Sequence, residues 1–578
     1  MGVWICLFLL TLPGFSQPVS AAEMRLELCP GRVLVGPEDP HLTDTEKRLV
    51  CGDPNSDSWS LIPESQALFH LRGFLQDRGF YNPTSRRDGK TIVFDMGQPS
   101  TVSDTVISGA PCALAAWDEQ ESRGERLTPQ MLKSLAARAE EVLGSQGFAC
   151  PRIETQADPV TGRVSLRVGN PRRQVWAKVE ETPMPELAPE TLRRYDSFLP
   201  GMPYSSEELR LSTQRVMESG VVRSAFFNIR CDGDRAIPAQ RIFLGPPREL
   251  RLGVGFNTDR GALLRAQWTN LRLGTRASRI STSLETSYMG RDFNSQVASV
   301  SGDWYFLEPP SRFLMRPQMT FKHESNNRGE TLNGEVSIAP VMRWDGQDIG
   351  YYVSLGPSLT GVRTLRGEGR KEAFFLALAS EFRMTSHAYE LNRLTPERGF
   401  ELSATGSLHR KGFLADYTAE SLRLRFTWLV PSHRYGNRKV IFGFRTGYST
   451  TFVRDAEGGI ANLTPNLRHY LGGTTNMRGF SVQEIPGDAG GLSAFFASLE
   501  ARSQGHLPFL LQPYAFVDVG MVSSRPLSIT DPWFLSPGVG LRWQSPVGVF
   551  RTSIAHGVHL SSRTAGAWRF HLSFGEEF

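Results

Sequence analysis

Cysteines and long apolar runs are both scarce in this 578-residue sequence. Six cysteines occur, and none follows Cys231. Beyond the first 22 residues no run of 18 apolar residues appears, which argues against a helical membrane protein. The net charge is only +5, and the lysines and arginines are scattered rather than clustered. The sequence therefore does not predict nucleic-acid binding.

Patterns typical of enzymes and metal sites are also missing. There is no Gly-x-Ser-x-Gly sequence, no Cys-x-x-Cys sequence and no Cys/His spacing that suits a metal ion. The stretch "LGVGF" at 252–256 contains two glycines, but it has the alternation of a strand and no helix follows, as a nucleotide site would require. We expect no catalytic residue, no metal and no cofactor.

The first 22 residues have the features of a secretory signal. Val3 to Leu12 is an apolar run of suitable length, and the small residues of "VSAAE" offer a cleavage site near Ala21 or Ala22. A short membrane-anchor helix is the alternative, although the run is short for a bilayer. Export would place the remaining chain where disulfides can form.

The remaining five cysteines allow a simple pairing by proximity in the sequence. We expect Cys29 to pair with Cys51, and Cys112 with Cys150. Cys231 would then remain as a buried, unreactive thiol, because it falls on the same strand face as apolar neighbours in "AFFNIRC".

Residues 23 to about 245 alternate helical patterns with short strands in three similar units. Each unit contains an amphipathic helix that ends at a glycine, and these glycines, Gly79, Gly147 and Gly220, are 68 and 73 residues apart. Such spacing predicts three small α+β modules. One irregular α+β domain is the alternative.

From Glu249 onward the sequence predicts sixteen alternating strands. One connection, residues 454–490 between the eleventh and twelfth strands, is far longer than the others. In the last strand Trp568, Phe570 and Leu572 share one face, while the residues between them are polar. An even number of aromatic-rich alternating strands in an exported chain predicts a closed transmembrane β-barrel, since lipid tolerates no open sheet edge. A soluble β-sandwich is the alternative.

Two short motifs narrow this interpretation. The long connection contains "MRGF" (Met477, Arg478, Gly479, Phe480), and the thirteenth strand contains "FVDVG" around Asp518. With the three modules and the aromatic carboxyl terminus, the chain resembles the BamA/TamA family of outer-membrane assembly factors, and its TamA type most.

The resemblance implies a domain order. We expect α+β POTRA modules followed by an all-β, 16-stranded antiparallel transmembrane barrel. The boundaries are 1–22 for the signal peptide, 23–97, 98–170 and 171–245 for the three modules, and 246–578 for the barrel.

The resemblance also implies a site. In this family the long loop folds back into the lumen, so Arg478 would pair with Asp518, and Gly472, Gly473 and Gly479 would allow the sharp backbone. Gly575 would let the last strand bend at the seam between the first and last strands, and Phe578 would serve as the carboxyl-terminal assembly signal. The sequence Arg-Gly-Phe also occurs at 72–74 and 398–400, where a helix face and a strand start explain it.

The implied function is insertion or secretion of barrel or autotransporter clients through this seam, in the outer membrane of a Gram-negative bacterium with the modules in the periplasm. The implied partners are unfolded outer-membrane proteins, a TamB-like periplasm-spanning protein, and the bilayer with its lipopolysaccharide. A two-partner-secretion pore that exports an unfolded substrate through the lumen is the alternative. A passive porin would not explain the modules.

Overall fold

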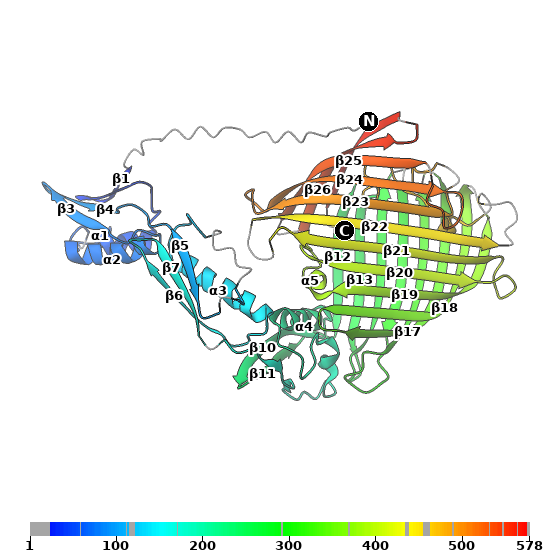
Figure 1. Cartoon of the computed structure of the whole chain (residues 1–578), viewed down its shortest axis with the longest axis horizontal. Coiled ribbons are helices and arrows are strands. Elements are labelled where there is room, and N and C mark those ends of the chain that lie inside the picture. Colours follow the sequence, from blue (N-terminus) through cyan, green and yellow to red (C-terminus); the bar gives the residue numbers. More distant parts are fainter. Residues whose placement is uncertain are drawn as a thin grey trace. The chain divides into compact units, whose positions relative to one another are not determined.

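The structure is a computed structural model, shown in Figure 1. It describes residues 24–574 apart from short gaps at 58, 111, 115–121, 170, 291–292, 327, 368–369, 434–437, 455–459, 461–462, 488–489, 531, 546–547 and 563. The predicted signal peptide, Gly575 and Phe578 lie outside the described residues.

One compact unit, residues 1–140 with 152–171, holds two small sheets. The first has the strand order β1-β2-β4-β3, and the second has the order β5-β7-β6. The elements of this part of the chain are β1 (Met24–Cys29), β2 (Arg32–Gly36), α1 (Asp44–Cys51), α2 (Glu64–Gln76), β3 (Thr84–Asp88), β4 (Thr91–Asp95), β5 (Asp104–Ser108), α3 (Pro129–Ser145), β6 (Arg152–Asp158) and β7 (Arg163–Gly169).

Local sequence explains where α3 begins and which face it buries. The Thr128 hydroxyl accepts a hydrogen bond from the Met131 amide (3.0 Å), so it caps the helix, and proline occupies the first turn. Met131, Leu135 and Ala139 follow at helical spacing and are buried. After α3, Gly147 takes a positive φ of 104°, as glycine readily does at a helix end.

The second unit begins with a third α+β module, whose sheet has the order β10-β11-β8. The Ser205 hydroxyl accepts from the Glu208 amide and starts α4. The Glu208 carboxylate does not complete a capping box but accepts from the buried Trp176 indole (3.1 Å). The elements are β8 (Val175–Trp176), β9 (Glu180–Glu181), η1 (Thr191–Tyr195), α4 (Ser206–Glu218), β10 (Val222–Asp232) and β11 (Arg235–Leu244).

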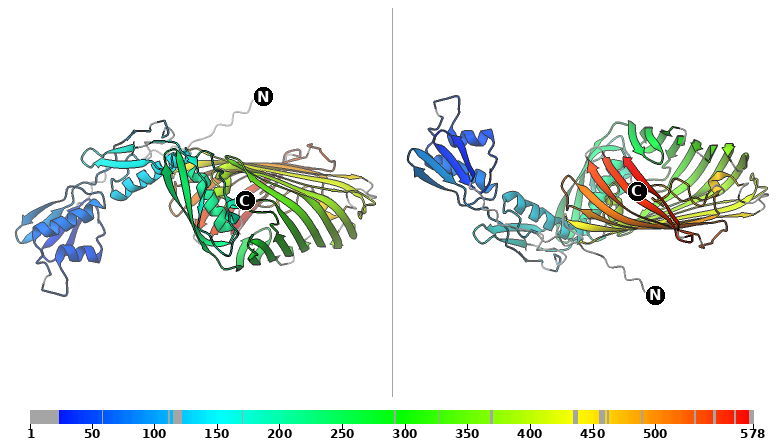
Figure 2. Two further views of the ribbon diagram at one scale, coloured as in Figure 1. Left: turned by 90° about the horizontal axis from the view of Figure 1, so that it is seen from below. Right: turned by 90° about the horizontal axis from the view of Figure 1, so that it is seen from above.

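The rest of this unit is a closed barrel of sixteen antiparallel strands, as the sequence predicted (Figures 1 and 2). A short helix, α5 (His387–Leu391), lies in the turn between β19 and β20. The strands are β12 (Arg248–Asn257), β13 (Gly261–Leu273), β14 (Ser278–Met289), β15 (Phe293–Asp303), β16 (Leu314–Asn326), β17 (Gly329–Asp345), β18 (Ile349–Gly367), β19 (Glu372–Ser386), β20 (Gly399–His409), β21 (Thr418–Pro431), β22 (Lys439–Arg454), β23 (Ser493–Gln504), β24 (Leu511–Ser523), β25 (Trp533–Ser545), β26 (Gly548–His559) and β27 (Thr564–Phe574).

The outer face of the barrel is apolar. Leu250, Leu252 and Val254 of β12 are 65–75% exposed, and Trp568 and Phe570 of β27 are 69% and 58% exposed. Exposed aromatic and aliphatic side chains around a closed sheet are what a bilayer requires. Among residues 24–574, outside the gaps given above, no helix is both long and apolar enough to cross a membrane.

The cysteine pairing differs in part from the prediction. Cys29 and Cys51 form a disulfide, as expected. The second disulfide joins Cys150 to Cys231, and Cys112 is an exposed free thiol. The prediction was wrong because it assumed that each pair stays within one module. The last residues before β6 instead meet β10 of the third module, and Cys231 is exposed at the end of that strand rather than buried.

Candidate functional site

The long connection between β22 and β23 folds against the inside of the barrel wall. Two glycines make its sharp turn possible: Gly472 has φ 127° and Gly473 has φ 92°. A side chain at Gly472 would lie 1.9 Å from the Ser481 carbonyl oxygen. The turn is closed by the Gly473 amide, which donates to the Phe480 carbonyl (2.9 Å). This part of the chain therefore returns on itself as a compact hairpin-like loop, as the sequence predicted for these glycines.

Apolar side chains anchor this loop. Met477 and Phe480 are 0% and 2% exposed, and they belong to a buried cluster with Leu471, Ile485 and Phe534. Phe534 belongs to β25, and its ring meets the Phe480 ring edge to face. Burial of two large side chains contributes about 1.5–3 kcal/mol each, so packing holds the loop as well as charge.

Arg478 forms the predicted contact with Asp518. Its Nε donates to Asp518 Oδ2 (2.9 Å) and its Nη2 to Asp518 Oδ1 (2.7 Å), so the guanidinium binds the carboxylate with two hydrogen bonds. The Arg478 side chain also lies over the Phe516 ring, 3.2 Å from the ring centre. Arg478 and Asp518 are 1% and 0% exposed. A pair this deeply buried is costly to break, because either partner alone would be an uncompensated charge.

The sequence analysis missed two further partners of Arg478. Its Nη1 donates to Glu500 Oε2 (2.9 Å), and its Nη2 to Ser498 Oγ (3.0 Å). Both residues lie on the lumen face of β23, where Ser498 is directly opposite Asp518. Alternation along β23 could have indicated an inward carboxylate at 500. Arg551 of β26 also donates to Glu500 Oε2 (3.0 Å), so the pair is part of a larger network.

Gly479 has a different role from the two glycines of the turn. Its φ is not positive, but a side chain there would lie 2.6 Å from the Gly557 amide nitrogen and 2.7 Å from Ser536 Oγ. Glycine is needed because the loop backbone touches the barrel wall. The expectation that Gly479 serves the sharp turn is therefore replaced by one of close packing.

The loop also connects the two strands that close the barrel. His571 of β27 contacts the Arg478 carbonyl through Nε2 (2.6 Å) and lies 3.5 Å from Asp259 through Nδ1. Asp259 follows β12 and accepts from the Thr474 amide of the loop. We call Asp259, Thr474, His571 and the Arg478 carbonyl the seam clasp. It holds the first strand, the last strand and the loop together at one point.

The backbone pairing between these two strands is limited. Phe256 is in register with Phe574, and Asn257 with Ser573. The chain then turns away after β12. Among the described residues, the last backbone hydrogen bond across the seam is donated by the Thr258 amide to the Leu572 carbonyl (3.0 Å). The part of β27 from Thr564 to His571 extends past this turn without a β12 partner among the described residues. This seam is therefore incomplete at that end.

The part of the chain that carries this loop and Asp518 matches a known domain. Residues 371–578 match the Omp85 superfamily domain. The Omp85 domain starts at β19 and includes the loop, Asp518 and the last strand. The sequence copy of Arg-Gly-Phe at 398–400 also lies in it, but there Gly399 takes φ 98° at the start of β20, and Arg398 pairs with Glu207 of α4.

Solved structures of three bacterial proteins match this chain in part. BamA from Haemophilus ducreyi lacking POTRA domains 1–3 is 16% identical, with a TM-score of 0.49, and the match covers 82% of this chain and 99% of that one. CdiB from Acinetobacter baumannii is 14% identical, with a TM-score of 0.44, and the match covers 88% of this chain and 97% of that one. CdiB from Escherichia coli is 12% identical, with a TM-score of 0.46, and the match covers 83% of this chain and 91% of that one.

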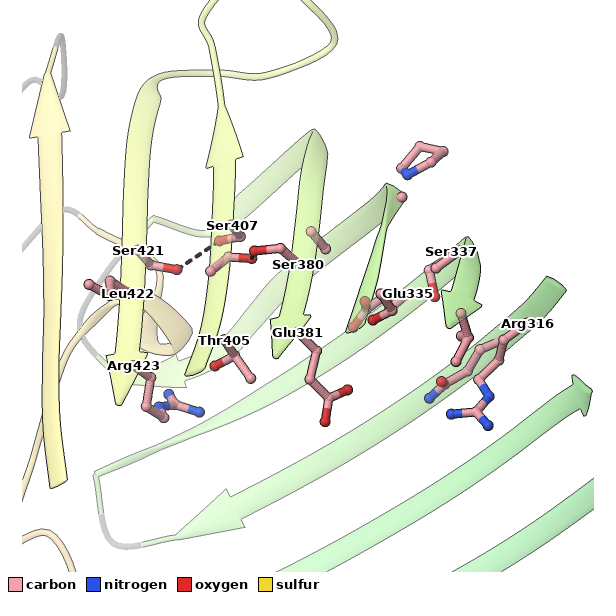
Figure 3. A pocket seen from close by; sticks show the side chains of 18 of the residues that line it. Arg316, Glu335, Ser337, Ser380, Glu381, Thr405, Ser407, Ser421, Leu422 and Arg423 are labelled. Carbon is pink, nitrogen blue, oxygen red and sulfur yellow. Dashed lines mark hydrogen bonds between the residues drawn. The ribbon is translucent and has the colours of Figure 1, made fainter. Parts of the chain in front are cut away.

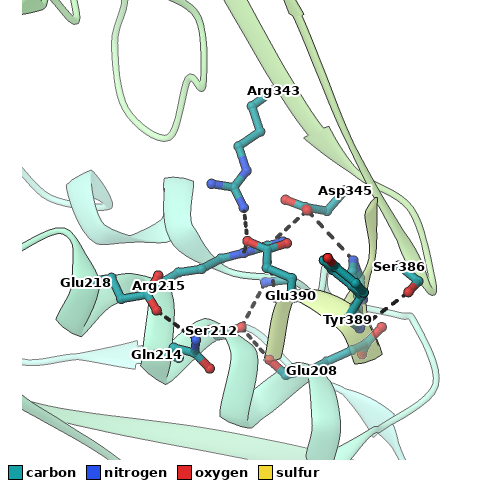
Figure 4. A network of polar contacts seen from close by, with 12 residues as sticks. Glu208, Ser212, Gln214, Arg215, Glu218, Arg343, Asp345, Ser386, Tyr389 and Glu390 are labelled. Atoms are coloured by element: carbon teal, nitrogen blue, oxygen red, sulfur yellow. Dashed lines mark hydrogen bonds and ion pairs between the residues drawn. The ribbon is translucent and has the colours of Figure 1, made fainter. Parts of the chain in front are cut away.

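Within the second unit, an ion network fastens the third module to the barrel (Figure 4). Arg215 of α4 donates through Nε to Glu390 Oε1 of α5 (2.9 Å), and its Nη1 lies 2.9 Å from Asp345 Oδ1 at the end of β17. Arg343 also donates to Glu390 (2.7 Å). The Arg215 and Asp345 side chains are 3% and 2% exposed. We call Arg215, Arg343, Asp345 and Glu390 the α4 clamp.

The closed barrel, its apolar outer face and the Omp85 domain support a place in an outer membrane. The contacts of Met477, Arg478, Phe480 and Asp518 are those of a loop fixed inside the barrel. Gly575 and Phe578 lie outside the described residues, so their roles stay predictions.

Proposed function

We propose that this protein inserts or exports barrel or autotransporter clients through the seam between β12 and β27, in the manner implied by the TamA type of the BamA/TamA family. The observation that carries this proposal is the incomplete seam. The Thr564–His571 edge of β27 has no β12 partner among the described residues, so its backbone groups can pair with an incoming strand.

The seam clasp gives the loop a role in this function. The loop touches both sides of the seam, through Asp259 beside β12 and His571 on β27. Arg478 fixes the same loop to Asp518 on the opposite side of the loop backbone. A strand that separates β12 from β27 must therefore break the clasp, while the Arg478–Asp518 pair keeps the loop in place. In this proposal the loop sets how readily the seam opens.

The proposed partners follow from this mechanism. Clients are unfolded outer-membrane proteins, and the apolar outer face contacts lipid, with lipopolysaccharide in the outer leaflet of a Gram-negative outer membrane. The periplasmic modules would receive clients or bind a TamB-like periplasm-spanning protein. The reaction is strand exchange and not catalysis, and the free energy of client folding drives it.

Disulfide locking of the seam tests the proposal. The register places Phe256 opposite Phe574, so Phe256→Cys with Phe574→Cys can lock the seam, and the described barrel contains no native cysteine to interfere. The matched control, Leu252→Cys with Ala266→Cys, locks β12 to β13 instead. We expect the oxidised seam variant to lose insertion of an unfolded barrel client into liposomes, and reduction to restore it. Undiminished insertion by the locked protein would contradict the proposal.

Export through the lumen is the second candidate function, and the interior cavities favour it. One cavity of about 330 Å³ and another of about 440 Å³ are lined largely by polar residues of the barrel wall. A two-partner-secretion pore would keep exporting its substrate when the seam is locked. Substrate export in the oxidised variant, measured by protease protection in liposomes, would therefore favour this alternative.

A further inference from the structure

Two arginines of β21 face the barrel lumen and have no carboxylate partner among the residues that the structure describes. Arg423 and Arg425 alternate with Leu422 and Leu424, so both guanidiniums lie on the inner face. Both side chains are exposed to the solvent of the lumen. Among the described residues neither forms an ion pair. Two like charges are thus held side by side on one strand, where they repel each other unless an anion lies between them.

The strand register shows why these charges stay uncompensated. Arg423 lies between Thr405 of β20 and Ser449 of β22. Arg425 lies between Ser403 and Gly447. All four neighbours are neutral. The nearest acid along β20, Glu401, is two residues from the position opposite Arg425 and forms no ion pair with it among the described residues.

Several other arginines of the lumen have acidic neighbours. Arg265 of β13 donates to Glu285 directly opposite on β14 (Nε to Oε2, 2.9 Å). Arg279 and Arg316 both bind Asp303, at 2.6 and 2.7 Å. An acid compensates the charge of each of these three arginines, whereas the register places no acid opposite Arg423 or Arg425.

Both arginines border space that a ligand can enter. Arg423 lines the 330 Å³ cavity, together with Glu381 and Thr405 (Figure 3). Arg425 lines the 440 Å³ cavity together with Glu401 and five further arginines, of which Arg478 and Arg551 are bound to Asp518 and Glu500. Each volume lies in the range of ligand sites. Positive charges that line a confined space focus their field and raise the local concentration of anions.

We propose that the β21 wall, defined as Arg423 and Arg425, binds an acidic stretch of extended polypeptide inside the barrel. This inference rests on the proposed function, because the polypeptide would be a client. The spacing favours a peptide: alternate residues of a strand lie about 6.6 Å apart, which is also the spacing of alternate side chains in an extended client. Carboxylates at alternate positions can therefore meet both guanidiniums, each in a two-bond geometry.

Peptide binding to the full-length protein in detergent micelles tests this site. The probe is a fluorescent, unfolded peptide in which Glu alternates with Ser, and the comparison peptide has Lys in place of Glu. We expect the acidic peptide to bind more tightly and its affinity to fall with salt. In the variant Arg423→Gln with Arg425→Gln, affinity falls roughly 10- to 100-fold, which corresponds to about 1.4–2.7 kcal/mol of binding free energy. Equal binding of both peptides would refute the proposal.

Three controls make the result specific. Arg265→Gln removes an equivalent lumen arginine that is already paired with Glu285, so it should leave the affinity unchanged. Electrophoresis without heating checks that each barrel remains folded. Inorganic phosphate is the competitor for a small-anion site. If phosphate displaces the peptide at equal charge concentration, the site is one for small anions and the peptide assignment is wrong.

The outcome is separable from that of the seam experiment. Loss of peptide binding in the β21 variant, together with normal client insertion when the seam is locked, would support this site and contradict the seam mechanism. Unchanged peptide binding in the variant, together with lost insertion in the locked protein, would contradict this site alone.

Discussion

Arg478 combines every feature that makes a buried charge costly to lose. It makes hydrogen bonds to Asp518, Glu500 and Ser498, and it stacks on Phe516. The guanidinium geometry matters as well as the charge, because a lysine ammonium cannot satisfy two carboxylates and a hydroxyl in one plane. A charge-swapped pair would be a poor test, since an aspartate at 478 would meet Glu500.

A double-mutant cycle of neutral replacements tests the pair instead. Arg478→Gln should destabilise the barrel by about 3–5 kcal/mol, because Asp518 becomes a buried, uncompensated charge. Asp518→Asn should cost a similar amount. In the double variant both charges are absent, so the loss should be smaller than the sum by about 1–3 kcal/mol. Urea unfolding in micelles, followed by electrophoretic mobility, measures the three values. Strict additivity would show that the two residues act independently.

Glu208 provides a pH-dependent contact in the third module. Burial raises the pKa of its carboxyl from 4.5 to about 8, although the Trp176 hydrogen bond opposes the shift. The negative charges of Asp348 and Asp345 raise this pKa further. The folded state therefore holds a proton that the unfolded state releases near pH 4.5. It follows that this residue's contribution to stability is complete below about pH 4.5 and is lost as pH rises through 8.

Glu208→Gln should remove that pH dependence, because the amide stays neutral and can still accept from the indole. We expect α4 amides in the native protein to exchange hydrogen faster, after correction for intrinsic rates, as pH rises from 5 to 9, as the raised pKa requires. In the variant the corrected rates should stay flat. If the corrected exchange rates rose equally in both proteins, a group other than Glu208 would control the pH dependence of hydrogen exchange in α4.

At the scale of elements, the sequence predicts strands far better than it predicts their long-range contacts. Alternation in the sequence predicts strands at 398–408 and 438–453, and the structure has β20 at Gly399–His409 and β22 at Lys439–Arg454, each within one residue of the prediction. Alternation identifies such strands because one face meets lipid and the other meets water. In contrast, α5 has only five residues, too few for a helical pattern.

The α4 clamp shows that ion pairs between distant parts of the chain cannot be predicted from local sequence either. Arg215 and Glu390 are 175 residues apart, and nothing in either local sequence relates them. Arg478 and Asp518 could be paired in advance only because the family resemblance connected them. Their neighbours Glu500 and Arg551, which no motif marks, were missed.

The clamp predicts how firmly α4 is held to α5. Arg215→Ala should cost about 3–5 kcal/mol locally, because Glu390 and Asp345 would lose a buried partner. We expect faster hydrogen exchange in α4 and in residues 387–398, with strands on the far side of the barrel unchanged. Arg210→Ala is the control on the same helix, since that side chain is 55% exposed and its ion pair contributes little. Unchanged exchange in Arg215→Ala would mean that packing alone holds the helix.

At the scale of the whole molecule, the disulfides stabilise only the N-terminal modules, and the barrel relies on closure. A closed sheet satisfies its backbone groups internally, so the barrel needs no covalent link. Small modules bury little apolar surface, and a cross-link helps them most. The pairing by nearest cysteine failed because the fold brings Cys150 to β10, 81 residues away in the sequence, rather than to Cys112.

The two disulfides and the free thiol predict which cysteine peptides are linked in the intact protein. Peptide mapping without reduction should recover Cys29 linked to Cys51 and Cys150 linked to Cys231, while Cys112 reacts with a thiol reagent before any reduction.

Cys150→Ser with Cys231→Ser should destabilise the third module by about 3–5 kcal/mol, because the open chain regains the entropy that a loop of this size loses. The barrel should keep its heat-resistant mobility, since neither cysteine lies in it. A Cys112–Cys150 peptide in the map would overturn this connectivity, and loss of the folded barrel would show that the two parts do not fold independently.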